Sequence, residues 1–91
     1  MRVRYTDTAL AEIESILSYI DNPMASAEVA EVIRATIARL ADYPRMASDT
    51  DVPGVRVTPA LPYRYLIFHK IEGDALVIRN VRHSARERPR Q

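Results

Sequence analysis

The residues best suited to chemistry stand in the last twelve positions, NVRHSARERPRQ at 80–91, which hold four arginines, one histidine and one serine. A guanidinium group binds phosphate or carboxylate through two parallel hydrogen bonds, and a histidine can move a proton near neutral pH. Ser84 directly follows His83, so on a strand these two side chains point to opposite faces. The segment therefore indicates anion binding, with proton transfer as a second chemistry open to His83.

The strands before this segment decide which other side chains join it. YRYLIFHKI at 63–71 and ALVIRNVRH at 75–83 are rich in β-branched and aromatic residues, and the glycine between them suits a hairpin turn. A two-residue loop places Arg64 opposite His83, whereas a three-residue loop places it opposite Arg82. Both registers predict one basic cluster built from separate strands. Its members are Arg64, Arg82, His83 and Arg86, with Arg56 joining from the strand at 55–59.

Three roles are open to this cluster. It could cleave RNA without a metal, through attack by the 2′-hydroxyl, with Arg64, His83 and Arg82 as candidate catalytic residues. That reaction needs an acid as well as a base, and no acid to match His83 is evident. The arginines could instead bind the carboxylates of a partner, or belong to a solvated strand end. We therefore assign no catalytic residue and do not expect an enzyme. We favour target binding by Arg56, Arg64, Arg82, His83 and Arg86.

Metal and cofactor chemistry find little support in the composition. The chain has no cysteine, only two glycines and only two histidines, which excludes thiolate metal sites and a glycine-rich phosphate loop. Asp49 and Asp51 lie two apart in the polar segment at 45–54 and could ligate a hard cation, but no further acid is clustered beside them. We expect a solvated loop there, no metal and no cofactor.

Two amphipathic helices are predicted between a first strand at 2–5 and the strands of the C-terminal half. The first begins after a capping residue, Thr6 or Asp7, and the second begins after Asn22 and ends at Tyr43. The order β-α-α-β-β-β predicts an α+β fold. We expect a small, mainly antiparallel sheet with the N-terminal two-helix hairpin packed on it.

The second helix carries more apolar residues than one buried face needs. Val29 and Val32 broaden its apolar stripe, and Tyr19 adds an aromatic ring on the first helix. These side chains either pack on the sheet or leave an apolar strip for another chain.

The length and the charge distribution indicate how many domains the chain has and what kinds of partner it binds. Ninety-one residues predict a single domain at 1–91, with a frayed tail at 86–91. Residues 1–51 carry five arginines against nine acids, a net charge of −4, and residues 52–91 carry eight cations against three acids, a net charge of +5. Two halves of opposite sign suggest two surfaces with different partners. No apolar run is long enough for a membrane span or a signal peptide, so we expect a cytoplasmic protein.

Nearly the whole chain resembles the RelE/ParE superfamily of toxins from type II toxin–antitoxin modules, and most of all its ParE-type, plasmid-stabilisation branch. The resemblance is carried by VRYTDTALAEIESILSYI, RLADYP and GVRV, and most strongly by PYR at 62–64 followed by two strands and the ending VRHSAR. It implies a small sheet with a two-helix hairpin and a cognate antitoxin whose C-terminal segment wraps the toxin. For that partner we single out Tyr19, Val29 and Val32.

The resemblance implies two possible targets. ParE-like members inhibit DNA gyrase, whereas RelE-like members cut mRNA on the ribosome. Arg64 matches an arginine that the nucleases use on phosphate, and His83 falls near their C-terminal catalytic residue. Lys70 is the only lysine and no aromatic residue follows Phe68, so the lysine-rich set and final aromatic of many nucleases are missing. These departures favour a growth-inhibiting toxin that acts on gyrase.

Overall fold

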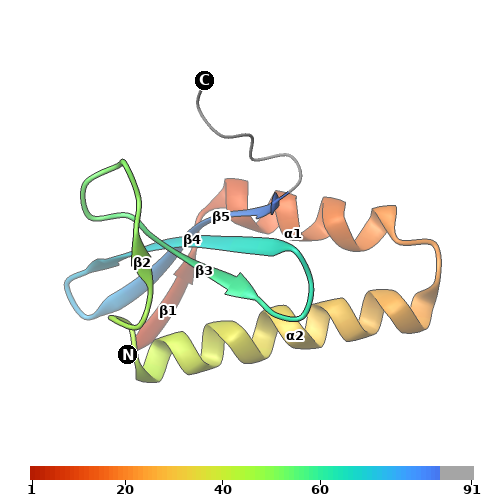
Figure 1. The fold of residues 1–91 in the computed structure, drawn as a ribbon, viewed down its shortest axis with the longest axis horizontal. Coiled ribbons are helices and arrows are strands. Elements are labelled where there is room, and N and C mark those ends of the chain that lie inside the picture. The colour runs from red at the N-terminus through yellow and green to blue at the C-terminus, as the bar shows by residue number, and fades with distance from the viewer. Residues whose placement is uncertain (85–91) are drawn as a thin grey trace.

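A five-stranded sheet and two helices on one of its faces make up the computed structural model, which describes residues 1–84 (Figure 1). The predicted β-α-α-β-β-β order and the α+β class are confirmed, with one addition, a two-residue strand inside the segment predicted as a loop. The predicted tail at 86–91, with Arg86, lies outside the described residues. The elements are β1 (Arg2–Tyr5), α1 (Asp7–Tyr19), α2 (Pro23–Asp42), β2 (Ser48–Asp49), β3 (Arg56–Ala60), β4 (Tyr65–Glu72) and β5 (Ala75–His83).

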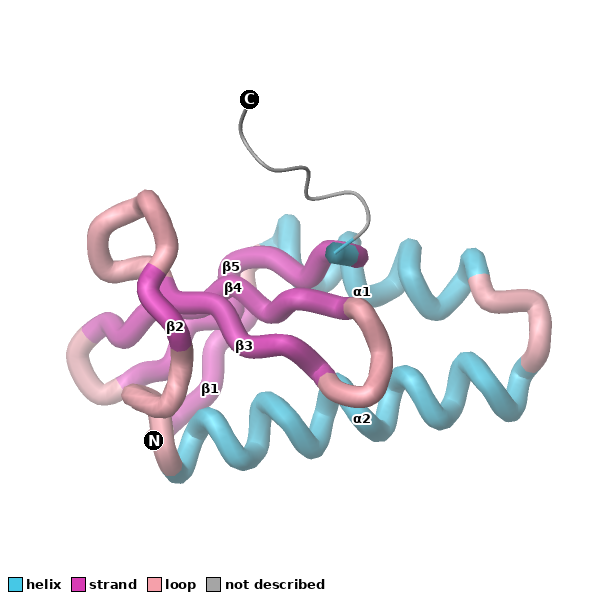
Figure 2. The backbone as a smooth tube through the Cα atoms, in the orientation of Figure 1, coloured by secondary structure: helices cyan, strands magenta, loops and turns pink. Residues whose placement is uncertain are grey.

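The strands lie in the order β1-β5-β4-β3-β2. β1 runs parallel to β5, and the other three pairings are antiparallel. The first strand of the chain thus lies beside the last one, and the helical hairpin connects it to the other side of the sheet (Figure 2). β1 is short and pairs with β5 only from Ala75 to Ile78. Beyond Ile78, no strand among residues 1–84 pairs with β5 on that side.

Side-chain caps start both helices where the sequence predicts them. Thr6 Oγ1 accepts the amide hydrogen of Ala9, and Asn22 Oδ1 accepts those of Met24 and Ala25. Each cap satisfies amides that the first helical turn leaves without a carbonyl partner. Neither helix in the described part of the chain is long and apolar enough to cross a membrane.

The core lies between the sheet and the two helices. Ile67, Leu76, Ile78 and Val81 are almost completely buried on the sheet side. Ala9 is the buried residue of α1, and α2 contributes a stripe with the periodicity of a helix face. That stripe consists of Val29, Ile33, Thr36, Ile37 and Leu40.

The β4–β5 hairpin turns at residues 73–74, and Gly73 has a φ of +60°, which a side-chain-bearing residue adopts only with strain. From this turn the strands keep one register as far as the pair His69 and Ile78. Arg79 then has no residue opposite it on β4, so β5 carries a β-bulge.

Because of the bulge, Arg64 lies opposite neither His83 nor Arg82, so both predicted positions are wrong. Tyr65 lies opposite His83, and the backbone carbonyl of Arg64 accepts the amide hydrogen of Ser84 at 2.6 Å. Arg64 therefore lies beyond His83 and Arg82, in the turn that leads into β4. The two-residue loop was predicted correctly, but the extra residue further along β5 shifts every pair that follows.

The Asn22 cap generates a stability prediction. Asn22→Ala removes the acceptor for two amide hydrogens at the start of α2, so the free energy of unfolding should fall by about 1 kcal/mol in chemical denaturation. Asp21→Ala changes the exposed neighbour, which caps neither helix, and should shift it by less than about 0.5 kcal/mol. Equal effects of the two substitutions would show that the cap does not stabilise the hairpin.

Candidate functional site

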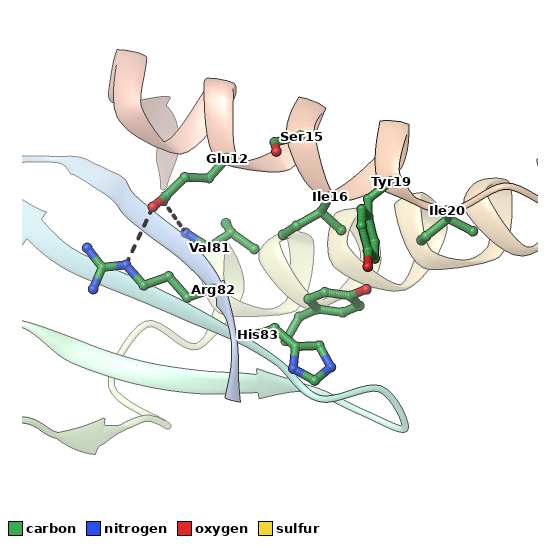
Figure 3. A pocket seen from close by; sticks show the side chains of 9 residues that line it. Glu12, Ser15, Ile16, Tyr19, Ile20, Val81, Arg82 and His83 are labelled. Carbon is green, nitrogen blue, oxygen red and sulfur yellow. Dashed lines mark hydrogen bonds and ion pairs between the residues drawn. The ribbon is translucent and has the colours of Figure 1, made fainter. Parts of the chain in front are cut away.

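A pocket of about 760 Å³ opens between α1 and the ends of β4 and β5 (Figure 3). It exists because the helical hairpin extends past the end of the sheet, as Figure 1 shows, so the last two turns of α1 have no strand opposite them. The lining residues are Glu12, Ser15, Ile16, Tyr19, Ile20, Tyr65, Val81, Arg82 and His83.

One wall of the pocket is made by the carboxylate of Glu12, which takes the place of a strand beside β5. Glu12 Oε1 accepts the amide hydrogen of Val81 at 2.9 Å and lies 3.3 Å from Asn80 Nδ2. Glu12 Oε2 accepts from Arg82 Nε at 3.4 Å, and Thr6 Oγ1 donates to the carbonyl of Arg79 at 2.9 Å. Polar groups of an exposed strand edge are thus satisfied by α1 and its cap instead of by a fifth residue of β1.

The floor of the pocket is apolar. Ile16 on α1 and Ile20, which caps the end of that helix, are partly buried against the core, and Val81 on β5 is 1% exposed. Tyr19 stands at the mouth with 80% of its surface exposed, and in Figure 3 it reaches from α1 toward the end of β5. A cavity with an aliphatic floor and a few polar groups at its rim suits an apolar side chain of a ligand or a partner.

The opposite wall is an aromatic pair at the ends of the two long strands. The rings of Tyr65 and His83 meet edge to face, with their centroids 5.2 Å apart. The bulge at Arg79 creates this contact, because it places His83 on the face of the sheet that carries Val81 and faces the helices. His83 is therefore a wall residue of the pocket, and Arg82 reaches round the strand edge to Glu12.

The predicted basic cluster is only partly assembled. Arg82 and His83 line the pocket together, as predicted for the end of β5. Arg64 lies at the same end of the sheet, exposed and without an ion pair to any described residue, but it does not line the pocket. Arg86 lies outside the described residues. The prediction that one patch gathers all of these cations is not borne out in the described part of the chain.

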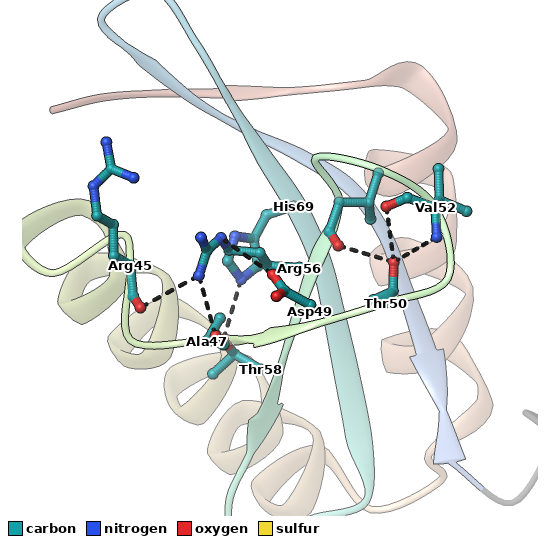
Figure 4. A network of polar contacts seen from close by, with 9 residues as sticks. Arg45, Ala47, Asp49, Thr50, Val52, Arg56, Thr58 and His69 are labelled. Carbon is teal, nitrogen blue, oxygen red and sulfur yellow. Dashed lines mark hydrogen bonds and ion pairs between the residues drawn. The ribbon is translucent and has the colours of Figure 1, made fainter.

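Arg56 lies elsewhere, so its predicted place in the cluster is wrong. It sits opposite His69, four residues along β4 from Tyr65, or about 13 Å. Its Nη1 donates to the carbonyls of Arg45 and Ala47, and its Nε lies 4.0 Å from Asp49 Oδ1 (Figure 4). Arg56 therefore ties the segment after α2 and the short strand β2 to the sheet.

The three residues singled out for the antitoxin do not form one surface. Val29 is 3% exposed and belongs to the core cluster, which corrects its prediction as a contact residue, because the fold of the chain itself already covers it. Val32 is half-buried and packs against the same core. Tyr19 is exposed and lines the pocket. It thus joins Arg82 and His83, which were predicted to bind the target instead.

Several lining residues were not singled out from the sequence. No local pattern marks Glu12, since its partners lie about seventy residues away. Ser15 looks like any polar helix residue. Tyr65 shares the helix-facing side of β4 with Ile67, a signal that the alternation of the strand did contain.

His69 on β4 is a buried structural residue. Its side chain is completely buried, with Nε2 3.1 Å from Thr58 Oγ1 and with no hydrogen-bond partner for Nδ1 among the described residues. Burial, and after it the positive charge of Arg56, lowers the pKa of His69 from 6.5 to about 4. The neutral imidazole is therefore the form that the fold requires.

Chemically, the pocket offers binding more readily than catalysis. Its one carboxylate, Glu12, is engaged by Val81 and Arg82. Within residues 1–84, no group of three histidine or acidic side chains lies close enough together to hold a metal ion. What remains is an apolar cavity with the imidazole of His83 in its wall and the guanidinium of Arg82 held by Glu12 at the strand edge.

A family model described as the ParE toxin of the type II toxin–antitoxin system parDE matches residues 3–88. Twelve chains of solved structures also match. One is a chromosomal ParDE system from P. aeruginosa, with a TM-score of 0.81 and 17% identity, covering 91% of this chain and 95% of that one.

Two further structures are more distant. The RelBE toxin–antitoxin complex of E. coli gives a TM-score of 0.66 at 12% identity, covering 88% of this chain and 92% of that one. A conserved hypothetical protein from Helicobacter pylori gives 0.61 at 12% identity, covering 93% and 96%. At these identities the likeness shows the fold. No curated protein matches the chain.

The Glu12 contacts predict a specific loss of stability. Glu12→Ala leaves the amide of Val81 without its acceptor, and the free energy of unfolding should fall by about 2 kcal/mol in urea denaturation. Glu14→Ala, on the exposed side of the same helix, should change it by less than about 0.5 kcal/mol. If Glu12→Ala is as stable as Glu14→Ala, the prediction is wrong, and water satisfies the amide of Val81 without loss of folding free energy.

The buried imidazole predicts a pH dependence. Between pH 6.5 and 4 the unfolded chain binds a proton at His69 that the folded chain does not, so stability falls as the pH is lowered through this range. The loss should reach on the order of 3 kcal/mol at pH 4. Urea denaturation of the wild type and of His69→Gln from pH 7 to 4 measures it, because the variant lacks the titrating group. Parallel pH profiles of the two proteins would contradict the assignment.

Proposed function

This chain belongs to the ParE toxin family of type II toxin–antitoxin systems, and from that premise we propose that it arrests growth by binding and inhibiting DNA gyrase in the cytoplasm, until a cognate antitoxin neutralises it. The match to the ParE model over residues 3–88 supports this target, since ParE-type resemblance implies gyrase inhibition.

The observation that carries the proposal is the character of the pocket at the end of β5. Its floor of Ile16, Ile20 and Val81 is apolar, and Arg82 and His83 are among its lining residues. Such a surface can bind a protein through one buried apolar side chain and charged contacts around it. Glu12 is committed to the strand edge, so no carboxylate lining the pocket is left to act as the acid that RNA cleavage would need.

In this proposal Arg82 and His83 contact the target inside the pocket, and Arg64 contacts it at the adjoining end of the sheet. Arg64 is suited to this role because it is exposed and forms no ion pair with any described residue. Arg56 is left out, since its guanidinium is engaged by the segment after α2.

A second candidate is a ribosome-dependent mRNA endonuclease of RelE type. The observation in its favour is the edge-to-face contact of Tyr65 with His83, next to Arg82. A phenol, an imidazole and a guanidinium are groups that could move a proton and stabilise a phosphate charge. The fold likeness to a RelBE chain agrees with either candidate.

Two assays of the purified chain, one for gyrase supercoiling and one for mRNA cleavage, distinguish the two targets. We expect the wild type to inhibit gyrase supercoiling and to leave mRNA intact in a translation extract. Arg82→Ala and Arg64→Ala should each raise the concentration needed for half inhibition at least about tenfold, the equivalent of one lost charged contact.

Arg39→Ala is the matched control, because Arg39 is an exposed arginine on α2 away from the pocket, and its inhibition should equal that of the wild type. If mRNA is cut within codons, and the cuts disappear in His83→Ala while supercoiling is unaffected by the wild type, the nuclease candidate is correct and gyrase is not the target.

A further inference from the structure

The turn at residues 61–64 connects β3 to β4 and carries Arg64 at its end. Leu61 is 71% exposed, and Pro62 and Arg64 are exposed as well. Within this turn, Tyr63 is the residue whose side chain packs against the core. The place of Arg64 therefore depends on how Tyr63 is held.

Tyr63 joins the turn to the second helix. Its hydroxyl donates to Glu28 Oε1 on α2 at 3.2 Å. Figure 1 shows the turn between β3 and β4 reaching from the sheet to this helix. A phenol keeps its proton at neutral pH, and a carboxylate is a strong acceptor for it. The bond thus ties an exposed turn to a helix whose inner face is part of the core.

The turn is also joined to the sheet through its backbone. The carbonyl of Arg64 accepts the amide hydrogen of Ser84 at 2.6 Å, and the amide of Tyr63 donates to the carbonyl of Ala60 at 3.1 Å. The rings of Tyr63 and Tyr65 lie with their centroids 6.5 Å apart. The backbone therefore fixes the turn to the two strands beside it, and Tyr63 supplies the side chain that fixes it to the helix.

A fixed turn matters because Arg64 has a long and flexible side chain. Its guanidinium forms no ion pair with a described residue that would hold it in advance. When such a side chain binds a partner, it loses rotamer freedom, and a mobile backbone beneath it adds the cost of ordering the loop. Holding the turn before binding removes this second cost and so raises the affinity of the contact.

We propose that Tyr63 and Glu28 are positioning residues, whose hydrogen bond holds the turn at 61–64 so that Arg64 is presented at the end of the sheet for contact with the target. This inference rests on the proposed function, because it takes Arg64 as a contact residue. It adds two residues to those on which the activity depends. Both act through Arg64.

Conservative variants with matched controls test the bond. Tyr63→Phe removes the hydroxyl and keeps the ring, and Tyr43→Phe makes the same change in a tyrosine that is 60% exposed at the end of α2. Glu28→Ala removes the acceptor, whereas Glu28→Gln keeps an amide oxygen that accepts the same hydrogen bond. Glu31→Ala changes another exposed glutamate of α2, which pairs with Arg34 instead. Circular dichroism and urea denaturation check that each variant folds.

The first measurement is the concentration that half-inhibits gyrase supercoiling. Tyr63→Phe and Glu28→Ala should each raise it about three- to tenfold, and Glu28→Gln and the two controls should stay within about twofold of the wild type. In an Arg64→Ala chain, Tyr63→Phe should change it less than about twofold, because the residue that it positions is gone. Equal factors in both backgrounds would show a merely structural role and overturn the inference.

The second measurement needs no target. The NMR order parameter of the Arg64 amide should be near about 0.85 in the wild type and fall toward about 0.6 in Tyr63→Phe and Glu28→Ala. An unchanged order parameter in both variants would overturn the inference, whatever the target is.

Failure of the proposed target gives a different result. If the wild type spares gyrase but arrests growth when it is expressed without an antitoxin, the target is wrong, and the same comparison of Tyr63→Phe in the two backgrounds is made on growth arrest. An effect that disappears in the Arg64→Ala background then supports the inference. A wild-type chain that neither inhibits gyrase nor arrests growth would overturn both the proposed function and this inference.

Discussion

The carboxylate of Glu12 lies where a strand would otherwise continue, and the arrangement of the candidate site depends on this contact. β1 pairs with β5 only as far as Ile78, so the following residues of β5 would expose backbone donors and acceptors to any passing strand. Glu12 accepts the amide hydrogen of Val81 and thereby fixes α1 beside β5. The last turns of α1 extend past the end of the sheet, and the pocket lies between them and the ends of β4 and β5.

The bulge at Arg79 is explained by the burial of Val81. If the register of the turn had continued, Asn80 and Arg82 would lie on the face toward the helices, and Val81 and His83 would point away from it. With the extra residue, Val81 is 1% exposed instead, and polar Asn80 is only partly buried and donates to Glu12. Burial of one valine therefore outweighs the lost pairing of one residue. As a consequence, His83 meets Tyr65 and enters the pocket.

Local sequence rules predicted the helices and strands, but they did not predict which residues form the candidate site. Helix caps, turn residues and apolar periodicity are properties of neighbouring residues, so both helices and the long strands appeared at or near their observed bounds. The place of Arg64 depends on a bulge, which turn length cannot reveal, although the break in alternation at Arg79 and Asn80 was visible. Glu12 depends on residues about seventy positions away, and no sequence spacing records that contact. Val29 was ambiguous because a buried face and a docking face have the same composition.

Residues that the sequence analysis assigned to two different partners meet in one place. Tyr19 was assigned to the antitoxin, and Arg82 and His83 to the target, yet all three line the same pocket. A small sheet covered on one face by helices has few concave surfaces, because its interior must be filled to stabilise the fold. The part of the helical hairpin that extends past the sheet provides a concave surface without removing any core residue. A molecule that fills this pocket would cover Tyr19, Arg82 and His83 together, because all three residues line it.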